Sequence, residues 1–159
     1  MSTCKALCRL PKEYARWDHS LGQCVLPDEN NLQLWQIHFT CPPECIYAHE
    51  KHILQFQIPN NYPIEPPQVQ FLTPIEHKHV YSNGVICLSI LYLNAENQES
   101  GTSWTPTLTI EKIYLSILSM ICNATARGRP HDDKEYIMQC ARGIVKPQTT
   151  RFHFDDDTC

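Results

Sequence analysis

The sequence lacks long hydrophobic runs, blocks of basic residues and internal repeats. Its apolar runs stay far below the roughly 20 residues that a membrane-spanning helix needs. The formal net charge is -4, and Arg127 with Arg129 forms the densest basic pair, which argues against nucleic acid as a main partner. Residues 1–10 also lack the apolar segment of a secretory signal. We therefore expect a cytoplasmic and nuclear protein, with neither a membrane nor a nucleic acid among its partners.

The nine cysteines do not indicate a disulfide-bonded scaffold. Their number is odd, no export signal precedes them, and 159 residues can bury a core without covalent crosslinks. Four residues of zinc-binding type lie close together, namely Cys41, Cys45, His49 and His52. Only three residues separate the two pairs, whereas zinc sites of this ligand type usually have about a dozen. We interpret the stretch as a hairpin connection and expect no metal, with zinc binding as the alternative.

Three segments alternate between apolar and polar side chains, which is the period of a half-buried β-strand. They lie at residues 35–40, 54–58 and 68–71, and the two connections between them are short and rich in Pro and Asn. Short connections of this kind join antiparallel neighbours. The pattern predicts an antiparallel meander, and residues 24–26 supply a fourth strand at its edge.

The apolar period changes to three and four over residues 109–122, which predicts a helix with Thr107 as its N-cap. A shorter helix is expected over residues 132–142. A first helix begins near Leu10, because Pro11 is tolerated only in a first turn, and the preceding residues are expected to be loose. Helices on either side of a run of strands predict a four-stranded α+β domain with the helices segregated from the sheet.

About thirty-five residues between Phe71 and Thr107 show no clear periodicity. A compact domain seldom carries so much loop unless the loop has a function. Cys87 lies in its middle, after a turn formed by Asn83 and Gly84 and among polar residues. An isolated cysteine is usually an inert, buried, small hydrophobic residue. The polar surroundings of Cys87 favour a reactive nucleophile instead.

The motifs around this loop resemble those of ubiquitin-conjugating enzymes, in the same order. Residues 62–67 read YPIEPP, residues 83–88 read NGVICL and residues 104–106 read WTP. They are similar to the Y-P-x-x-P-P, N-G-x-I-C-L and W-S-P motifs of that family. Residues 77–79 read HKH where the family has H-P-N. The resemblance covers nearly the whole chain and implies the UBC fold, with a catalytic domain over residues 1–147.

Within the family, the chain most resembles the W type, which attaches ubiquitin to protein N-termini. It shares with that type His79, the run of residues 87–91 and an ending similar to Asp-Asp-Thr-Cys, which lies in a tail over residues 148–159. The resemblance implies that Cys87 accepts ubiquitin as a thioester from the activating enzyme and passes it to an amine. ATP is used upstream by the activating enzyme, so no cofactor is expected in this chain.

The resemblance also assigns roles beside the cysteine. His79 takes the place of the family's Asn, where a neutral imidazole either donates a hydrogen bond to the reaction's oxyanion or orders the loop. His77 matches the family's structural histidine, and Lys78 replaces the motif's proline and loosens the backbone. Ser89 stands where lysine-directed relatives commonly have Asp.

The missing acidic residues point to the acceptor. Lysine-directed relatives commonly have a second acidic residue after the long helix, where this chain has Arg127, Gly128 and Arg129. An α-amine with a pKa of about 7.7 to 8.0 is roughly 10 to 20% free base near neutrality, against about 0.1% for a lysine of pKa about 10.4. We therefore expect transfer to the N-terminal α-amine of substrates, because that amine needs less help to lose a proton.

By analogy with the family, two surfaces bind partner enzymes. A ligase of RING or U-box type is expected to contact Pro63, Ile64, Trp104 and Pro106. The activating enzyme is expected to contact Lys5, Arg9 and Lys12, for which ordinary surface charge is the alternative.

Residues between Tyr92 and Ser103 form an insertion relative to the W type. It is either a tolerated solvent-exposed loop or a lid that selects the acceptor. Two rival readings of the whole chain stay open at this point: a noncatalytic UBC-fold module that binds ubiquitin, and a carrier of another ubiquitin-like modifier.

Overall fold

The computed structural model describes residues 3–93 and 103–144, with side chains from Cys8 onward. Four antiparallel strands form one sheet in sequence order. They are β1 (Gln23–Val25), β2 (Leu34–Thr40), β3 (Lys51–Gln57) and β4 (Gln68–Phe71). The predicted meander is confirmed, including its short fourth strand at the edge.

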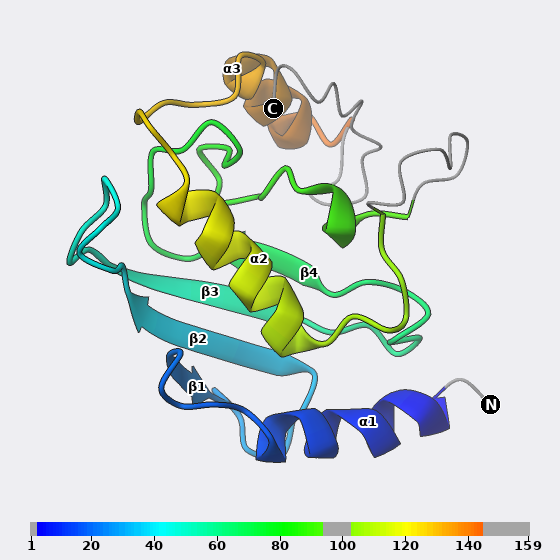
Figure 1. Ribbon diagram of the computed structural model, residues 1–159. Helices are drawn as coiled ribbons and strands as arrows, with labels where there is room; N and C mark the ends of the chain where they lie inside the picture. Colours follow the sequence, from blue (N-terminus) through cyan, green and yellow to red (C-terminus); the bar gives the residue numbers. More distant parts are fainter. Residues whose placement is uncertain (1–2, 94–102, 145–159) are drawn as a thin grey trace.

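Three helices lie over one face of this sheet and beside its two edges (Figure 1). Helix α2 (Ile110–Cys122) crosses one face of the sheet, while α1 (Thr3–Ala15) lies near its β1 edge. The third, α3 (Asp133–Ala141), lies beyond the β4 end. The α+β class is therefore confirmed. Within the part of the chain that the structure describes, no helix is long and apolar enough to cross a membrane.

The core forms between the sheet and α2, as the two periodicities require. In β2, Trp35 and Ile37 are fully buried, while Gln36 between them is partly exposed. Five residues of α2 are fully buried against this face, namely Ile110, Ile113, Tyr114, Ile117 and Ile121. Burying apolar surface stabilises a fold by about 25 cal/mol per Å². This layer therefore supplies much of the stability on which the irregular loops depend.

The prediction for the first helix was wrong about its start. Helix α1 begins at Thr3, and Pro11 lies inside it rather than in its first turn. Tertiary contacts outweigh the hydrogen bond that this proline removes. Leu10 is 1% exposed, and the Glu13 carboxylate accepts hydrogen bonds from the Tyr62 hydroxyl at 2.8 Å and the Ile110 N–H at 2.9 Å.

The helices α2 and α3 end close to where the sequence predicts. The N-cap of α2 is Thr109 and not Thr107: the Thr109 side chain accepts a hydrogen bond from the Lys112 N–H at 3.2 Å. After α3, Gly143 adopts a φ of 69°, a conformation that suits glycine at a helix end.

The connection between β2 and β3 is a hairpin loop, as predicted. It is closed by hydrogen bonds from the Cys41 N–H to the Glu50 carbonyl at 2.8 Å and from the His49 N–H to the Cys41 carbonyl at 3.1 Å. His52 is buried and its Nδ1 lies 3.0 Å from Thr73 Oγ1. Among the residues whose side chains the structure describes, no group of three or more His, Cys, Asp or Glu could hold a metal ion, and none of the seven cysteines there is in a disulfide bond.

The irregular segment begins with a close backbone contact at the edge of β4. The Phe71 N–H donates to the Gly84 carbonyl at 2.9 Å, and Val85 forms an antiparallel bridge with Gln70. A Cβ atom at Gly84 would lie 2.1 Å from the Phe71 carbonyl oxygen, and the φ of Gly84 is +86°. Only glycine fits this position, which sets where the residues up to Cys87 run.

We predict that Gly84→Ala destabilises the protein far more than Gly143→Ala. Both glycines have positive φ, so both alanines carry backbone strain of roughly 1 kcal/mol. Nothing lies within 4 Å of a Cβ at Gly143, whereas Gly84 meets the Phe71 carbonyl. The free energy of unfolding, measured by chemical denaturation, should fall by roughly 3 kcal/mol or more for Gly84→Ala. Equal losses for the two variants would contradict the contact.

Candidate functional site

Cys87 lies in the irregular segment after β4 and is held there by backbone hydrogen bonds. Its N–H donates to the His79 carbonyl at 2.8 Å, and Val80 bridges to Ile86. The side chain of Cys87 is only 3% exposed and belongs to a small buried cluster with Tyr81, Val85 and Tyr136. The thiol is therefore shielded from solvent in this conformation.

The start of α3 holds the same segment from the other side. The Tyr81 hydroxyl lies 3.2 Å from both carboxylate oxygens of Asp132, and the Ser82 N–H donates to Asp133 at 2.7 Å. The rings of Tyr81 and Tyr136 pack with centroids 4.0 Å apart. Sequence analysis did not identify Asp132, Asp133 or Tyr136 as site residues, because nothing in a short amphipathic helix indicates which loop it covers.

Tyr92 closes the base of the predicted insertion. Its hydroxyl donates to the Ile86 carbonyl at 2.7 Å, and its own carbonyl accepts from the Trp104 N–H at 3.1 Å. These contacts bring the two ends of the insertion together next to the residue that precedes Cys87. Residues 94–102 lie outside the described part of the chain, so its role as lid or tolerated loop stays a prediction.

His77 is buried and ties the segment to α2. Its Nδ1 accepts a hydrogen bond from the His79 N–H at 3.0 Å, and its ring also bonds the backbone of Met120. Burial lowers the pKa of His77 to about 4, with smaller contributions from His79 and Lys78. The imidazole is therefore neutral near pH 7, and its two nitrogens serve one acceptor and one donor role.

His79 lies directly beside Cys87. Burial lowers the pKa of His79, a hydrogen bond to the backbone of Cys87 opposes that shift, and the Lys78 charge lowers the pKa further. The rings of His77 and His79 are tilted, with centroids 5.3 Å apart. The neutral imidazole of His79 thus contacts the cysteine's backbone, and His77 lies behind it; neither ring supplies a formal charge near pH 7.

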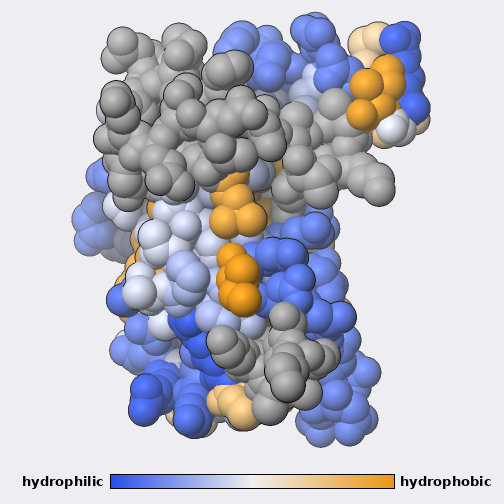
Figure 2. All heavy atoms as spheres, turned by 90° about the vertical axis from the view of Figure 1, so that its right-hand side faces the viewer, coloured by the Kyte–Doolittle hydropathy of each residue, from blue (hydrophilic) through white to orange (hydrophobic). Residues whose placement is uncertain are grey.

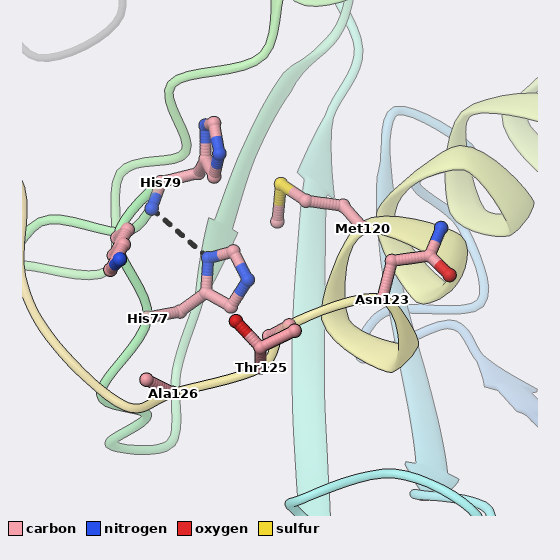
Figure 3. A pocket seen from close by; sticks show the side chains of 8 residues that line it. His77, His79, Met120, Asn123, Thr125 and Ala126 are labelled. Atoms are coloured by element: carbon pink, nitrogen blue, oxygen red, sulfur yellow. Dashed lines mark hydrogen bonds between the residues drawn. The ribbon is translucent and has the colours of Figure 1, made fainter. Parts of the chain in front are cut away.

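A cavity of about 280 Å³ opens between this loop and the end of α2 (Figure 3). His77 and His79 line one side of it, while Met120, Asn123 and Thr125 line the other. His79 is thus both a residue of the cavity wall and the residue whose carbonyl accepts the Cys87 N–H.

The two arginines after α2 bind other parts of the chain. Arg127 donates to the Ile46 carbonyl at 3.3 Å, pairs with Glu50 and lies over the Tyr47 ring, 4.7 Å from its centroid. Arg129 donates to two carbonyls of the segment that leads to the cysteine, at 2.6 and 3.2 Å. Arg129 therefore positions this segment, a role that sequence analysis did not predict.

Ser89 lies just after the cysteine and starts a single 3₁₀ turn, Ser89–Leu91. It is partly exposed. Neither this position nor the segment after α2 contributes a carboxylate from the places where lysine-directed relatives have one.

The predicted ligase surface combines one exposed apolar side chain with a buried support. Ile64 is 55% exposed, whereas Trp104 is 5% exposed and donates from Nε1 to the Pro63 carbonyl at 2.9 Å. Pro106 is exposed, and its carbonyl accepts a hydrogen bond from Arg9. Figure 2 shows hydrophobic groups on this side of the molecule amid a mostly hydrophilic surface. The buried Trp104 thus supports the loop that contains Pro63 and Ile64 through this hydrogen bond.

The three candidate contacts with the activating enzyme differ in their surroundings. Lys12 is exposed, whereas the Arg9 guanidinium binds Glu13 and the carbonyl of Leu108 and lies over the Tyr62 ring. The side chain of Lys5 lies outside the described part of the chain. All three assignments stay predictions.

Comparisons with known proteins agree with this architecture. The family model described as ubiquitin-conjugating enzyme matches residues 9–143. Ubiquitin-conjugating enzyme 15 of Arabidopsis thaliana is 43% identical over 151 residues, which cover 94% of this chain and 88% of that protein. The probable ubiquitin-conjugating enzyme E2 W of Dictyostelium discoideum is 38% identical over 152 residues, covering 94% of this chain and 95% of that protein.

The fold is shared with solved structures of the same family. The ubiquitin-conjugating enzyme E2 UbcA1 from Agrocybe aegerita superposes with a TM-score of 0.72 at 26% identity, over 92% of this chain and 98% of that chain. The predicted UBC fold and the resemblance to the W type are both confirmed. With the family model spanning most of its length, the chain belongs to the ubiquitin-conjugating enzymes, a family of transferases.

Proposed function

We propose that this enzyme carries ubiquitin as a thioester on Cys87 and transfers it to the N-terminal α-amine of protein substrates. The observation that supports the nucleophile is the position of Cys87 in the family's N-G-x-I-C-L motif, with its backbone fixed by His79. The family implies three further partners: ubiquitin, its activating enzyme and a ligase. We propose a ligase of RING or U-box type.

Transthiolation exchanges the thioester of the activating enzyme for one on Cys87, and the activating enzyme's thiol leaves. The substrate amine then attacks the thioester carbonyl, and a tetrahedral oxyanion forms before Cys87 leaves as the thiolate. The neutral His79 ring has one N–H and already hydrogen-bonds the Cys87 backbone, so it either orders the loop through that bond or releases the bond to donate to the oxyanion. Because Cys87 is 3% exposed, the side chains around it move before a ubiquitin C-terminus reaches the sulfur.

The choice of an α-amine is supported by the residue types at the two positions considered in the sequence. Ser89 is not acidic, and Arg127 and Arg129 are engaged elsewhere. The carboxylates of Asp132 and Asp133 are bound to Tyr81 and Ser82. A lysine acceptor needs a nearby carboxylate to lower the cost of losing its proton, since its pKa is about 10.4. An α-amine with a pKa near 8 supplies a useful fraction of free base without that help.

ATP is consumed upstream, and we propose that the enzyme itself needs no cofactor and acts in the cytoplasm and nucleus. Two other functions share the fold: a noncatalytic ubiquitin-binding module and a carrier of another modifier. The presence of Cys87 disfavours the first. The second differs only in which modifier forms the adduct.

We predict that incubation with ubiquitin-activating enzyme, ATP and ubiquitin gives one adduct that a reducing agent removes. Cys87→Ala should form none, and Cys87→Ser should form an oxyester that resists reduction, because oxygen replaces sulfur at the reacting atom. Non-reducing and reducing gels measure both.

Cys24→Ala is the control for this experiment, because Cys24 lies in β1, at the edge of the sheet opposite to β4 and Cys87. Its adduct should form as in the wild-type protein. A wild-type protein that forms an adduct with another modifier but not with ubiquitin would contradict the proposed cargo, and one that forms no adduct would contradict the enzyme.

We predict that the loaded enzyme discharges onto a lysine-free peptide with a free N-terminus faster than onto an acetylated peptide with one lysine. Below about pH 8 the α-amine rate should rise with pH and then level off, whereas the lysine rate should keep rising, because the two amines titrate near 8 and 10.4. Single-turnover assays between pH 6.5 and 9 measure both rates. Equal rates for the two peptides at pH 7 would rule out the preference.

We predict that Ser89→Asp restores part of the lysine activity. A carboxylate two residues after Cys87 can orient a lysine acceptor and accept its proton during the attack. Discharge onto the lysine peptide should therefore rise by about threefold or more. Ser89→Ala is the control and should leave the ratio of the two rates unchanged. A rise in both rates by the same factor would show that Ser89 does not discriminate between amines.

A further inference from the structure

The cavity beside the cysteine loop contains a single formal charge near pH 7. Its eight lining residues are His77, Lys78, His79, Met120, Asn123, Ala124, Thr125 and Ala126. Both histidines have pKa values lowered by burial, so they are neutral near pH 7. The Lys78 ammonium is therefore the one charge in the lining.

Among the residues that the structure describes, the Lys78 ammonium forms no ion pair with a carboxylate. Lys78 is exposed, and its side chain runs over Gly128, whose missing side chain leaves it room. A Cβ at Gly128 would lie 3.4 Å from Lys78 Cγ and 3.9 Å from Cε. The aliphatic part of the side chain is thus supported while the charge stays in solvent.

The surroundings of the charge are polar and suit an anion. Thr125 offers an exposed hydroxyl close to His77, as Figure 3 shows. The amide of Asn123 points away from the two imidazoles and donates to Ser119 Oγ at 3.3 Å. The cavity volume of about 280 Å³ accommodates one or two side chains of an extended peptide.

One residue of the cavity wall is hydrogen-bonded to the reacting residue. His79 lines it and accepts the Cys87 N–H through its carbonyl at 2.8 Å. An acceptor peptide whose N-terminal nitrogen reaches Cys87 therefore has its next residues within reach of this cavity. The inference that follows rests on the proposed transfer to α-amines.

We propose that the cavity takes an acidic side chain of the acceptor, two or three residues from its N-terminus, and that Lys78 is the specificity-determining residue. A carboxylate there pairs with the Lys78 ammonium. A basic side chain is repelled by the same charge. Because the pair is exposed to solvent, its contribution is modest, and the selectivity it gives is about twofold to fivefold in rate.

The test compares three peptides with free N-termini that differ only at the third residue, which is Asp, Asn or Lys. None of them contains any other lysine. Discharge of the preloaded wild-type thioester should be about twofold to fivefold faster with Asp than with Asn, and slower with Lys. Because both charges are exposed, 0.5 M NaCl should reduce the difference. A version of the lysine peptide with an acetylated N-terminus measures transfer to the lysine side chain, and that rate is subtracted.

Four variants separate charge from structure. Lys78→Met should remove the preference, Lys78→Glu should reverse it, and Lys78→Arg should retain it, because only the sign of the charge matters. Lys112→Glu is the matched control, since Lys112 is exposed at the opposite end of α2 from the cavity. It should keep the wild-type order of the three peptides.

Two outcomes overturn the proposal. Equal rates for the three peptides with wild-type enzyme would show that the cavity does not sense the acceptor. Loss of stability in Lys78→Met with an unchanged order of peptides would show that Lys78 only complements the carbonyl end of α2. Failure of the proposed function looks different, because no peptide with a free N-terminus would then accept ubiquitin at all.

Discussion

The neutral imidazole of His77 holds the loop that carries Cys87 in its conformation. The loop has almost no regular secondary structure, so its backbone groups need partners outside themselves. His77 accepts the His79 N–H at 3.0 Å and bonds the backbone of Met120, which joins the loop to the end of α2. A proton on His77 would remove the acceptor and bury a charge, and burial keeps that proton off near pH 7.

The other contacts of the loop build on this attachment. His79, which is positioned by His77, binds the backbone of Cys87. On the opposite side, Asp132 next to α3 contacts the Tyr81 hydroxyl, and Arg129 donates to the carbonyl of Val80. The hydrogen bonds join three separate elements, the edge of β4, the end of α2 and the start of α3. The position of the cysteine therefore depends on the packed layer of sheet and helix, which holds these elements at fixed distances from one another.

The periodic parts of the fold could be predicted because their patterns are local. Strands with alternating burial, such as β2, and the apolar stripe of α2 bury the residues that the sequence indicates. The start of α1 could not be predicted this way. Pro11 has a clear local cost, and the contacts that outweigh it, from Glu13 to Tyr62 and Ile110, join residues far apart in the chain.

By itself, the sequence determined the family, the position of Cys87 in the family's motif and the absence of acidic residues at two positions near it, because motifs and residue types are read directly. Only the tertiary structure decided where the charges lie. Arg127 and Arg129 flank Gly128, over which the Lys78 side chain runs, yet both arginines bind distant carbonyls or Glu50. Lys78 is the charged residue that lines the cavity. Electrostatic energy depends on distance and burial, and neither follows from the order of residues along the chain.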